Sequence, residues 1–439
     1  MRHPSIARWL GVPLDREDAA RLWMDTPENP MIVTAVLRLD APLDFATFVD
    51  LVEERALARD RLRAHIVPPL APLLRPRWRD DGQASVADHV AHVQLERGHG
   101  GGPPGDGELA RILSRIASEP LDHARPLWRM WLIDGDGDRS AIAVRIHHVI
   151  ADGLALLGVL YGFSDEGADS LSPPFVAPVA PGAAPRGGHL VRRAAELARL
   201  VARGPDAPPA LAGRPRGAKA LGWSAPFDVA SLRRAAHGVD AHLNDVVLGA
   251  LAGAVRSLVA RDGSPPNHPV HVLVPVALPH VAGALGNRFA SLFVRLPIDF
   301  AGEVDRVIAA RDAMREARAA SGVELGRSLI GAAVALREPV ERIGVRVLSR
   351  RATLVVSNVA GPTEALHVAG RRIDSILFAA PTSGSLALSA SAFSYAGELR
   401  VTIGVDTAVV PDPWSIVELF EEEMRVTLGL LQGITARSA

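Results

Sequence analysis

The sequence predicts a mixed α/β protein built from two domains, in which mixed sheets are flanked by helices. Its 439 residues exceed what one ordinary core accommodates and suit two domains of roughly 200 residues each. In both halves of the chain, segments with the two-residue period of strands alternate with segments that have a helical period. A stretch rich in Pro, Ala, Gly and Arg lies between the halves. We therefore expect an N-terminal domain over residues 1–171, a crossover linker over 172–220 and a C-terminal domain over 221–439.

The first predicted elements are a strand, a helix and a hairpin. Residues 33–39 are rich in β-branched side chains and partly alternate, which is typical of a strand. Asp44 is a suitable N-cap for the helix that follows, because apolar residues recur after it at three-to-four spacing. Residues 127–133 and 141–146 flank a loop rich in Asp and Gly, which predicts a β-hairpin. This loop lacks the later Glu of an EF-hand, so it does not predict a calcium site.

The linker contains one helical pattern. Residues 189–203 carry an apolar stripe with arginines at other positions, which predicts a basic amphipathic helix. We favour a helix that packs on its own protein. The alternative is a helix that contacts a membrane surface or an anionic ligand.

The C-terminal half again mixes helical and strand patterns. It is predicted to contain a helix over residues 244–258, strands over 271–275, 291–296 and 353–356, and a strand pair joined at 395–398. The chain has no short-period repeat, so a solenoid or a propeller is not expected.

The composition excludes several classes of protein. The formal net charge of -1 gives no overall field that would attract nucleic acid. The absence of cysteine excludes disulfides, thiolate nucleophiles and cysteine metal sites, so any chemistry must come from His, Asp, Ser or Asn. The N-terminus lacks the long apolar core of a secretory signal, and the most apolar run, residues 154–163, is far shorter than the roughly 20 residues of a membrane-spanning helix. We therefore expect a cytoplasmic protein.

The segment His-His-x-x-x-Asp-Gly at residues 147–153 is the main candidate for chemistry. Because side chains alternate along a strand, His148 and His147 point to opposite faces, which makes a shared metal ion geometrically awkward. No metal site is expected. A histidine at a strand end, before a tight turn and a helix, can act as a general base toward a hydroxyl group. Asp152 is expected to tie the loop, and Gly153 permits the close turn. Each residue alone also has an ordinary structural explanation, as a strand end or an N-cap.

Several separate motifs accompany this segment in a fixed order. With them the chain resembles the bacterial wax ester synthase/diacylglycerol acyltransferase family over nearly its whole length. The motifs that carry the resemblance are residues 13–15, 29–33, 120–128, 147–153, 244–248, 286–287, 357–362 and 394–397. The histidine motif alone would also suit nonribosomal condensation domains and other acyltransferases, so the flanking motifs decide.

The resemblance implies two chloramphenicol-acetyltransferase-like domains with a substrate tunnel between them. It implies acyl-CoA as co-substrate without any cofactor, and a diacylglycerol or a long-chain alcohol as acceptor, with triacylglycerol as the preferred product. It further implies peripheral contact with the membrane or with lipid inclusions. The competing hypotheses are a carrier-protein-dependent acyltransferase or condensation enzyme, and a lipid-binding protein that has lost turnover.

The same resemblance assigns roles to individual residues. By carry-over His148 deprotonates the acceptor hydroxyl, and the predicted catalytic set also contains His147, Asp152 and Gly153. The predicted substrate-binding residues are Asn244, Asp245, Asn287, Ser357 and Asn358.

Two of these residues have alternative roles, and the chain departs from the family at two places. Asn244 stands where a helix N-cap belongs, so capping and tunnel function are both open, while Asn358 is favoured as a turn residue. Residues 277–280 replace the Ser and Arg that often follow the Pro-Val pair, so the contribution of that Arg is either absent or supplied elsewhere, with Arg288 as the candidate. Ala360 replaces a common Pro, which should matter little because Gly and Pro still follow it.

Overall fold

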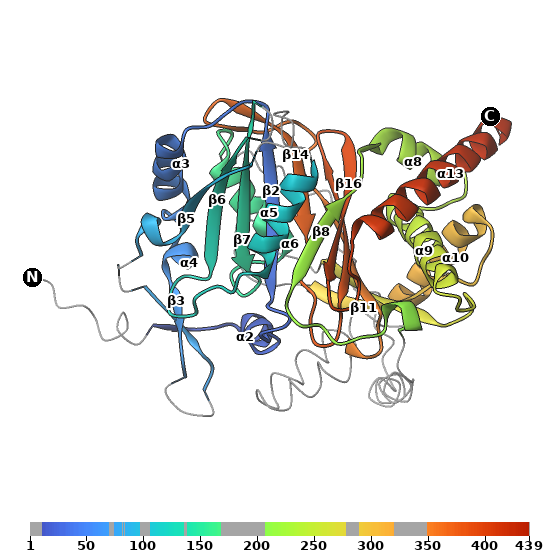
Figure 1. The fold of residues 1–439 in the computed structure, drawn as a ribbon, viewed down its shortest axis with the longest axis horizontal. Helices are drawn as coiled ribbons and strands as arrows, with labels where there is room; N and C mark the ends of the chain where they lie inside the picture. Colours follow the sequence, from blue (N-terminus) through green and yellow to red (C-terminus); the bar gives the residue numbers. More distant parts are fainter. Residues whose placement is uncertain are drawn as a thin grey trace, which may run out of the picture.

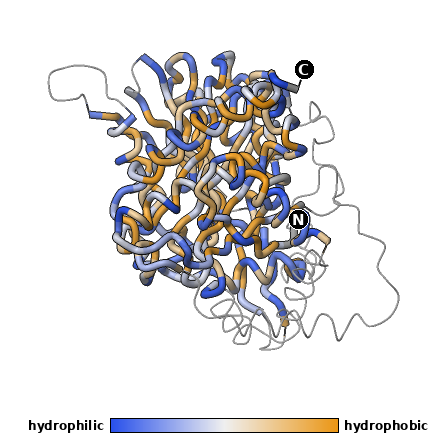
Figure 2. Tube along the Cα trace, turned by 90° about the vertical axis from the view of Figure 1, so that its right-hand side faces the viewer, coloured by the Kyte–Doolittle hydropathy of each residue, from blue (hydrophilic) through white to orange (hydrophobic). Residues whose placement is uncertain are grey.

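The computed structural model describes residues 11–69, 74–80, 82, 84–96, 106–135, 138–167, 207–277, 289–319 and 349–438. Within this part of the chain, two large β-sheets stand next to each other, each with helices against it (Figure 1). Hydrophobic segments run through the middle of the molecule, and hydrophilic segments gather toward its edge (Figure 2). The predicted mixed α/β class is confirmed.

The first sheet has six strands in the order β13-β14-β2-β7-β6-β5. Their bounds are β2 Ile32–Leu39, β5 Val90–Gln94, β6 Trp128–Asp134, β7 Ser140–His147, β13 His367–Val368 and β14 Arg371–Ala379. Strands β6 and β7 pair antiparallel, which confirms the predicted hairpin, and β2 confirms the first predicted strand. A small separate sheet joins β1 Val12–Pro13, β4 Arg77–Arg79 and β3 His65–Val67.

Helices cover both faces of the first sheet. On one face α3 and α6 enclose the main apolar core, and on the other face α5 packs against alternate side chains of the same strands. The side chain of Asp44 accepts a hydrogen bond from the amide of Thr47 at 2.9 Å, which confirms it as the N-cap of α3. The bounds are α2 Arg16–Trp23, α3 Phe45–Leu51, a π-helix Val52–Ala56, α4 Asp60–Arg63, a 3-10 helix Val86–Asp88, α5 Asp106–Ser118 and α6 Gly153–Phe163.

The second sheet runs in the order β11-β10-β12-β15-β16-β8, with β9 beside β16. Its strands are β8 Lys219–Trp223, β9 Phe227–Asp228, β10 Val270–Ala277, β11 Phe289–Leu296, β12 Leu354–Ala360, β15 Leu388–Tyr395 and β16 Glu398–Asp406. The helices around it are a 3-10 helix Pro209–Leu211, α8 Val229–His237, α9 Leu243–Arg261, α10 Glu303–Ala319 and α13 Trp414–Ser438. The helix and the strands predicted for this half are confirmed, including the pair β15 and β16.

Helix α9 is the core helix of this second unit. It lies among α8, α10 and α13, which gather on one side of the sheet (Figure 1). Among the described residues it is the one helix whose length and composition would let it cross a membrane, and 67% of that apolar window is buried inside the protein.

The two sheets do not follow the two halves of the chain. Strand β14, from the C-terminal half, pairs antiparallel with β2 in the first sheet, with Phe378 opposite Ala35. The next strand, β15, returns to the second sheet. Residues 172–206, with the predicted amphipathic helix, lie outside the described residues. The domain boundaries at 171 and 220 stay predictions.

Candidate active site

The turn after β7 is held by backbone contacts to the neighbouring strand. The amide of His148 donates to the carbonyl oxygen of Met31 at 2.6 Å, and the amide of Ile150 donates to the carbonyl of His147 at 3.0 Å. Asp152 then caps α6, since its Oδ1 accepts a hydrogen bond from the amide of Ala155 at 3.0 Å. The expected sequence of strand, tight turn and helix is therefore present.

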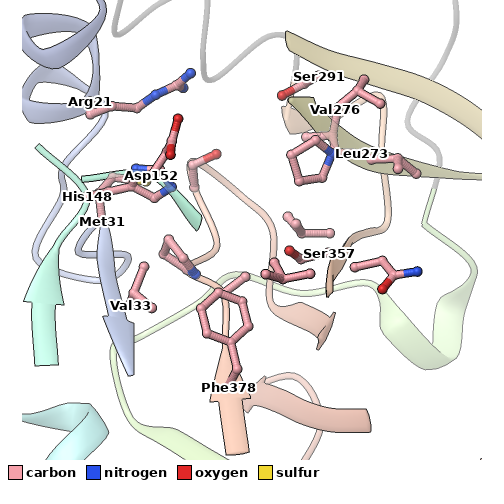
Figure 3. Close-up of a pocket in the computed structure, with 18 of the residues that line it drawn as sticks. Arg21, Met31, Val33, His148, Asp152, Leu273, Val276, Ser291, Ser357 and Phe378 are labelled. Atoms are coloured by element: carbon pink, nitrogen blue, oxygen red, sulfur yellow. The ribbon is translucent and has the colours of Figure 1, made fainter. Parts of the chain in front are cut away.

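A pocket of about 280 Å³ lies between the two sheets and receives side chains from both. His148 and Asp152 reach it from the turn, and Ser357 reaches it from the facing strand β12 (Figure 3). Among the predicted site residues, Asn244 and Asn358 also line it. Apolar side chains such as Val33 make up much of the remaining wall. The structure thus brings five of the predicted residues to one cavity.

His147 has a different environment from its neighbour. It is fully buried and is not among the residues that line the pocket. Its Nδ1 accepts a hydrogen bond from the amide of Val149 at 3.0 Å, so the ring proton sits on Nε2. In the described part of the chain, no group of three or more His, Asp or Glu residues is arranged to hold a metal ion.

Asp25 contacts this turn from outside the pocket, and no motif in the sequence marks it. Its Oδ2 lies 3.4 Å from Nε2 of His147 and 3.4 Å from Nε2 of His123, which are ion-pair distances. The contact with His147 lacks hydrogen-bond geometry and is electrostatic. Its Oδ1 accepts a hydrogen bond from the amide of Met31 at 2.6 Å. Burial alone would raise the pKa of Asp25, but the two imidazoles and this amide hold that pKa well below its usual range.

Comparison with known proteins identifies the family. Residues 14–241 match the wax ester synthase/diacylglycerol acyltransferase catalytic domain, and residues 285–427 match the WS/DGAT C-terminal domain. The chain belongs to the wax ester synthase/diacylglycerol acyltransferase family. A relative from Mycobacterium bovis, named after a diacylglycerol O-acyltransferase activity, is 30% identical over 87% of this chain and 84% of its own. A similarly named protein of Mycobacterium tuberculosis is 28% identical over 94% of this chain and 89% of its own.

Solved structures show the fold of the wax ester synthase/diacylglycerol acyltransferase family. The wax ester synthase/diacylglycerol acyltransferase from Marinobacter aquaeolei VT8 superposes with a TM-score of 0.70 at 19% identity, covering 96% of this chain and 100% of its own. The first condensation domain of the calcium-dependent antibiotic synthetase superposes with a TM-score of 0.64 at 19% identity, covering 98% and 97%. The expected two-domain acyltransferase fold is confirmed.

Of the two roles left open for Asn244, the structure excludes the N-cap, and it corrects the turn favoured for Asn358. The N-cap of α9 is His242, not Asn244, because the chain turns into the helix two residues earlier than expected. The carboxylate of Asp245 accepts a hydrogen bond from the amide of His242 at 2.8 Å, while burial raises the pKa of this carboxyl. Asp245 is not among the residues that line the pocket.

Asn358 lies within strand β12 and not in a turn, because Leu354–Ala360 pairs parallel with β15. From there its Nδ2 donates to Oδ1 of Asn244 at 3.3 Å. This hydrogen bond joins β12 to the start of α9 across the wall of the pocket. Capping therefore does not explain Asn244, and its other proposed role, in the pocket, has geometric support.

Cationic side chains also reach the pocket. Arg21 from α2 and Arg318 from α10 line it, and Arg318 is exposed, which places it at the rim. Neither was singled out from the sequence, where the abundance of arginine hides them. The predicted residues Asn287 and Arg288 lie outside the described residues.

Proposed function

We propose that this protein transfers a fatty acyl group from acyl-CoA to the hydroxyl group of a lipid acceptor. Diacylglycerol is the main acceptor and triacylglycerol the main product, with long-chain alcohols giving wax esters as a second activity. The observation that carries the proposal is the position of His148, which lies in a largely apolar pocket between the two sheets of a protein of this family.

His148 acts as the general base. It removes the proton of the acceptor hydroxyl, and the oxygen attacks the carbonyl carbon of the thioester. A carbon–oxygen bond forms, the carbon–sulfur bond breaks, and the imidazolium returns the proton to the CoA thiolate. General base catalysis of this kind accelerates a reaction by roughly 10²- to 10⁴-fold.

The polar groups around His148 position the substrates. Ser357, Asn358 and Asn244 are among the hydrogen-bonding side chains of a wall that is largely apolar, where such groups are effective toward a developing oxyanion. His147 and Gly153 shape the turn and do not touch the substrate. Arg318, at the rim, suits the phosphate groups of CoA, whose reactive end must reach inward to His148.

The acceptors are lipids, so the enzyme works at the cytoplasmic face of the membrane or at lipid inclusions, as a peripheral protein. It needs acyl-CoA as co-substrate and no metal or other cofactor.

A second candidate function is acyl transfer from a carrier protein, which the shared fold of condensation domains makes reasonable. The family match and the relatives named after diacylglycerol O-acyltransferase favour the acyl-CoA-dependent reaction. A third candidate is a lipid-binding protein without turnover. Such a protein would not require His148 and Asp152 in its pocket, so their presence favours an enzyme.

The test measures free CoA and triacylglycerol formed by the purified protein from palmitoyl-CoA and dioleoylglycerol. We expect His148→Ala to lower the rate by roughly 10²- to 10⁴-fold. His237→Ala, at an exposed histidine of α8, is the matched control and keeps the wild-type rate. No product from the wild type would contradict the proposed activity. Full activity of His148→Ala would contradict the mechanism while leaving the activity intact.

A further inference from the structure

A second cavity lies inside the first unit, between the first sheet and helix α6. Its volume is about 70 Å³, and all of its lining side chains are apolar. They come from β2, β6, β7, β14, β15 and α6, with Ala35 and Phe163 as examples. We call this space the α6 cavity. Because no polar group faces it, water has no partner there, and the cavity is suited to hydrocarbon.

The helix that covers the α6 cavity is also held by polar contacts on its outer side. Arg59 donates a hydrogen bond to the carbonyl of Gly158 at 2.9 Å, and Arg55 donates to the carbonyl of Phe163 at 2.9 Å. Gly153–Phe163 carries no charged residue. Protein interiors are normally close-packed, so a cavity under a helix that is fixed in this way is a candidate binding space.

The α6 cavity adjoins the pocket that contains His148. Val33 and Phe378 line both spaces, so these two side chains form a wall that the spaces share. Figure 3 shows both at the lower end of the pocket, with His148 and Asp152 on the same side of the site. Because α6 begins directly after Asp152, the helix over the cavity is attached to the proposed catalytic turn.

We propose that the α6 cavity takes the methyl end of the acyl chain of the donor, which enters between Val33 and Phe378. This inference rests on the proposed function and specifies the donor arm of the same site. An acyl-CoA is charged at one end and apolar at the other. The pocket has Arg318 at its rim on the side of the second sheet, and the α6 cavity adjoins its opposite side. The chain end of an acceptor is also apolar, so the experiment below tests donors and alcohols separately.

The test changes the size of the α6 cavity in both directions. Ala35→Leu fills it, and Phe163→Leu enlarges it. Val36→Leu is the matched control, because Val36 follows Ala35 on β2 but packs on the opposite face of the sheet. The measurement is kcat/KM for octanoyl-, lauroyl-, palmitoyl- and stearoyl-CoA with dioleoylglycerol.

We expect Ala35→Leu to lower the ratio of palmitoyl-CoA to octanoyl-CoA activity by at least about tenfold, since one methylene in an apolar pocket is worth about that much. Phe163→Leu should raise the ratio of stearoyl-CoA to palmitoyl-CoA activity, and Val36→Leu should keep the wild-type ratios. Opposite changes of the activity ratios in Ala35→Leu and Phe163→Leu indicate a change in how the acyl chain fits, because general destabilisation would lower the rates for all donors together. Phe163→Leu alone decides if Ala35→Leu does not fold.

Unchanged acyl-CoA ratios in both variants overturn this inference. It is equally overturned if the variants change the ratio of dodecanol to octadecanol activity and leave the acyl-CoA ratios unchanged, because the cavity then holds the acceptor. Failure of the proposed function looks different, since the wild type then releases no CoA from any donor. In that case the melting temperature with each donor decides. If palmitoyl-CoA raises the melting temperature of the wild type more than octanoyl-CoA does, and Ala35→Leu removes that difference, the inference is supported. Equal shifts with the two donors overturn it.

Discussion

The carboxylate of Asp25 lies 3.4 Å from Nε2 of His147, the residue directly before the proposed base. The same carboxylate accepts the amide hydrogen of Met31, whose carbonyl accepts the amide hydrogen of His148. Asp25 therefore fixes His148 from two sides without touching the pocket. We infer that it is a positioning residue.

Asp25→Asn tests this role. The amide keeps the size of the side chain but loses its charge, so the turn should lose its electrostatic tie to His147. We expect kcat to fall about tenfold with little change in the KM for palmitoyl-CoA, because a small displacement of His148 weakens the transition state and leaves donor binding intact. Steady-state kinetics measures both constants. Asp50→Asn, at an exposed position of α3, is the control, and an unchanged kcat in Asp25→Asn would contradict the role.

The same cluster predicts how stability depends on pH. The pKa of Asp25 is lowered in the folded protein, so its contribution is present above about pH 4 and is lost as the pH falls below that value. The hydrogen bond to Asp25 raises the pKa of His123, so that contribution is present below about pH 6.5 and is lost as the pH rises through the folded pKa. Their joint contribution to the free energy of unfolding is therefore largest between these two values.

Urea denaturation of the wild type and of Asp25→Asn from pH 3 to pH 9 measures this dependence. The difference between the two free energies of unfolding should peak at pH 4–6.5 and decrease on both sides. A difference that does not vary with pH would contradict this explanation, because it would mean that folding does not change the pKa values of Asp25 and His123.

Asp152 has a structural role that can be separated from chemistry. Its side chain caps α6, so Asp152→Ala should lower the free energy of unfolding by about 1 kcal/mol, whereas Asp152→Asn should retain the cap and the stability. Chemical denaturation measures both variants. If Asp152→Asn is stable but inactive, the carboxylate does more than cap the helix.

Lys219 joins the second sheet to the loop before β2 through a largely buried polar contact. Its Nζ donates to Oδ1 of Asn29 at 2.6 Å and lies 3.1 Å from Oδ2 of Asp406, whose side chain is fully buried. Lys219→Met leaves that carboxylate without its cation and should cost roughly 2–3 kcal/mol, near the lower end for such pairs because Lys219 is partly exposed. Thermal denaturation measures the loss. The double variant with Asp406→Asn should recover part of it, and no recovery would exclude the charge as the cause.

Gly361 lies where no side chain fits. A Cβ atom there would stand 2.5 Å from the carbonyl oxygen of Ser394, so Gly361→Ala should destabilise the protein by about 1–3 kcal/mol. Gly429→Ala is the control, because its Cβ would meet no atom within 4 Å and a helical Gly→Ala change is neutral or stabilising. Equal melting temperatures for the two variants would contradict this explanation of the glycine.

The sequence predicted the features that depend on neighbouring residues. The cap at Asp44, the hairpin of β6 and β7, and the turn that presents His148 all follow from local patterns. Gly361 and Pro362, which follow Asn358, favour a turn there, but pairing with β15 keeps Asn358 within a strand, and that partner lies too far along the chain for a local pattern to indicate it. Asp25 was missed because its partners His123 and His147 lie far along the chain, and no local pattern marks such a contact.

The pairing of β14 with β2 has a consequence for biosynthesis. While the chain emerges from the ribosome, the edge of β2 that β14 later covers stays unpaired until residues 371–379 have been made. An open strand edge of this kind can pair with other nascent chains. The N-terminal half therefore needs protection, by a chaperone or by rapid synthesis, until β14 has been made and pairs with β2. A gene cut between the two halves would leave the N-terminal fragment with that edge permanently exposed.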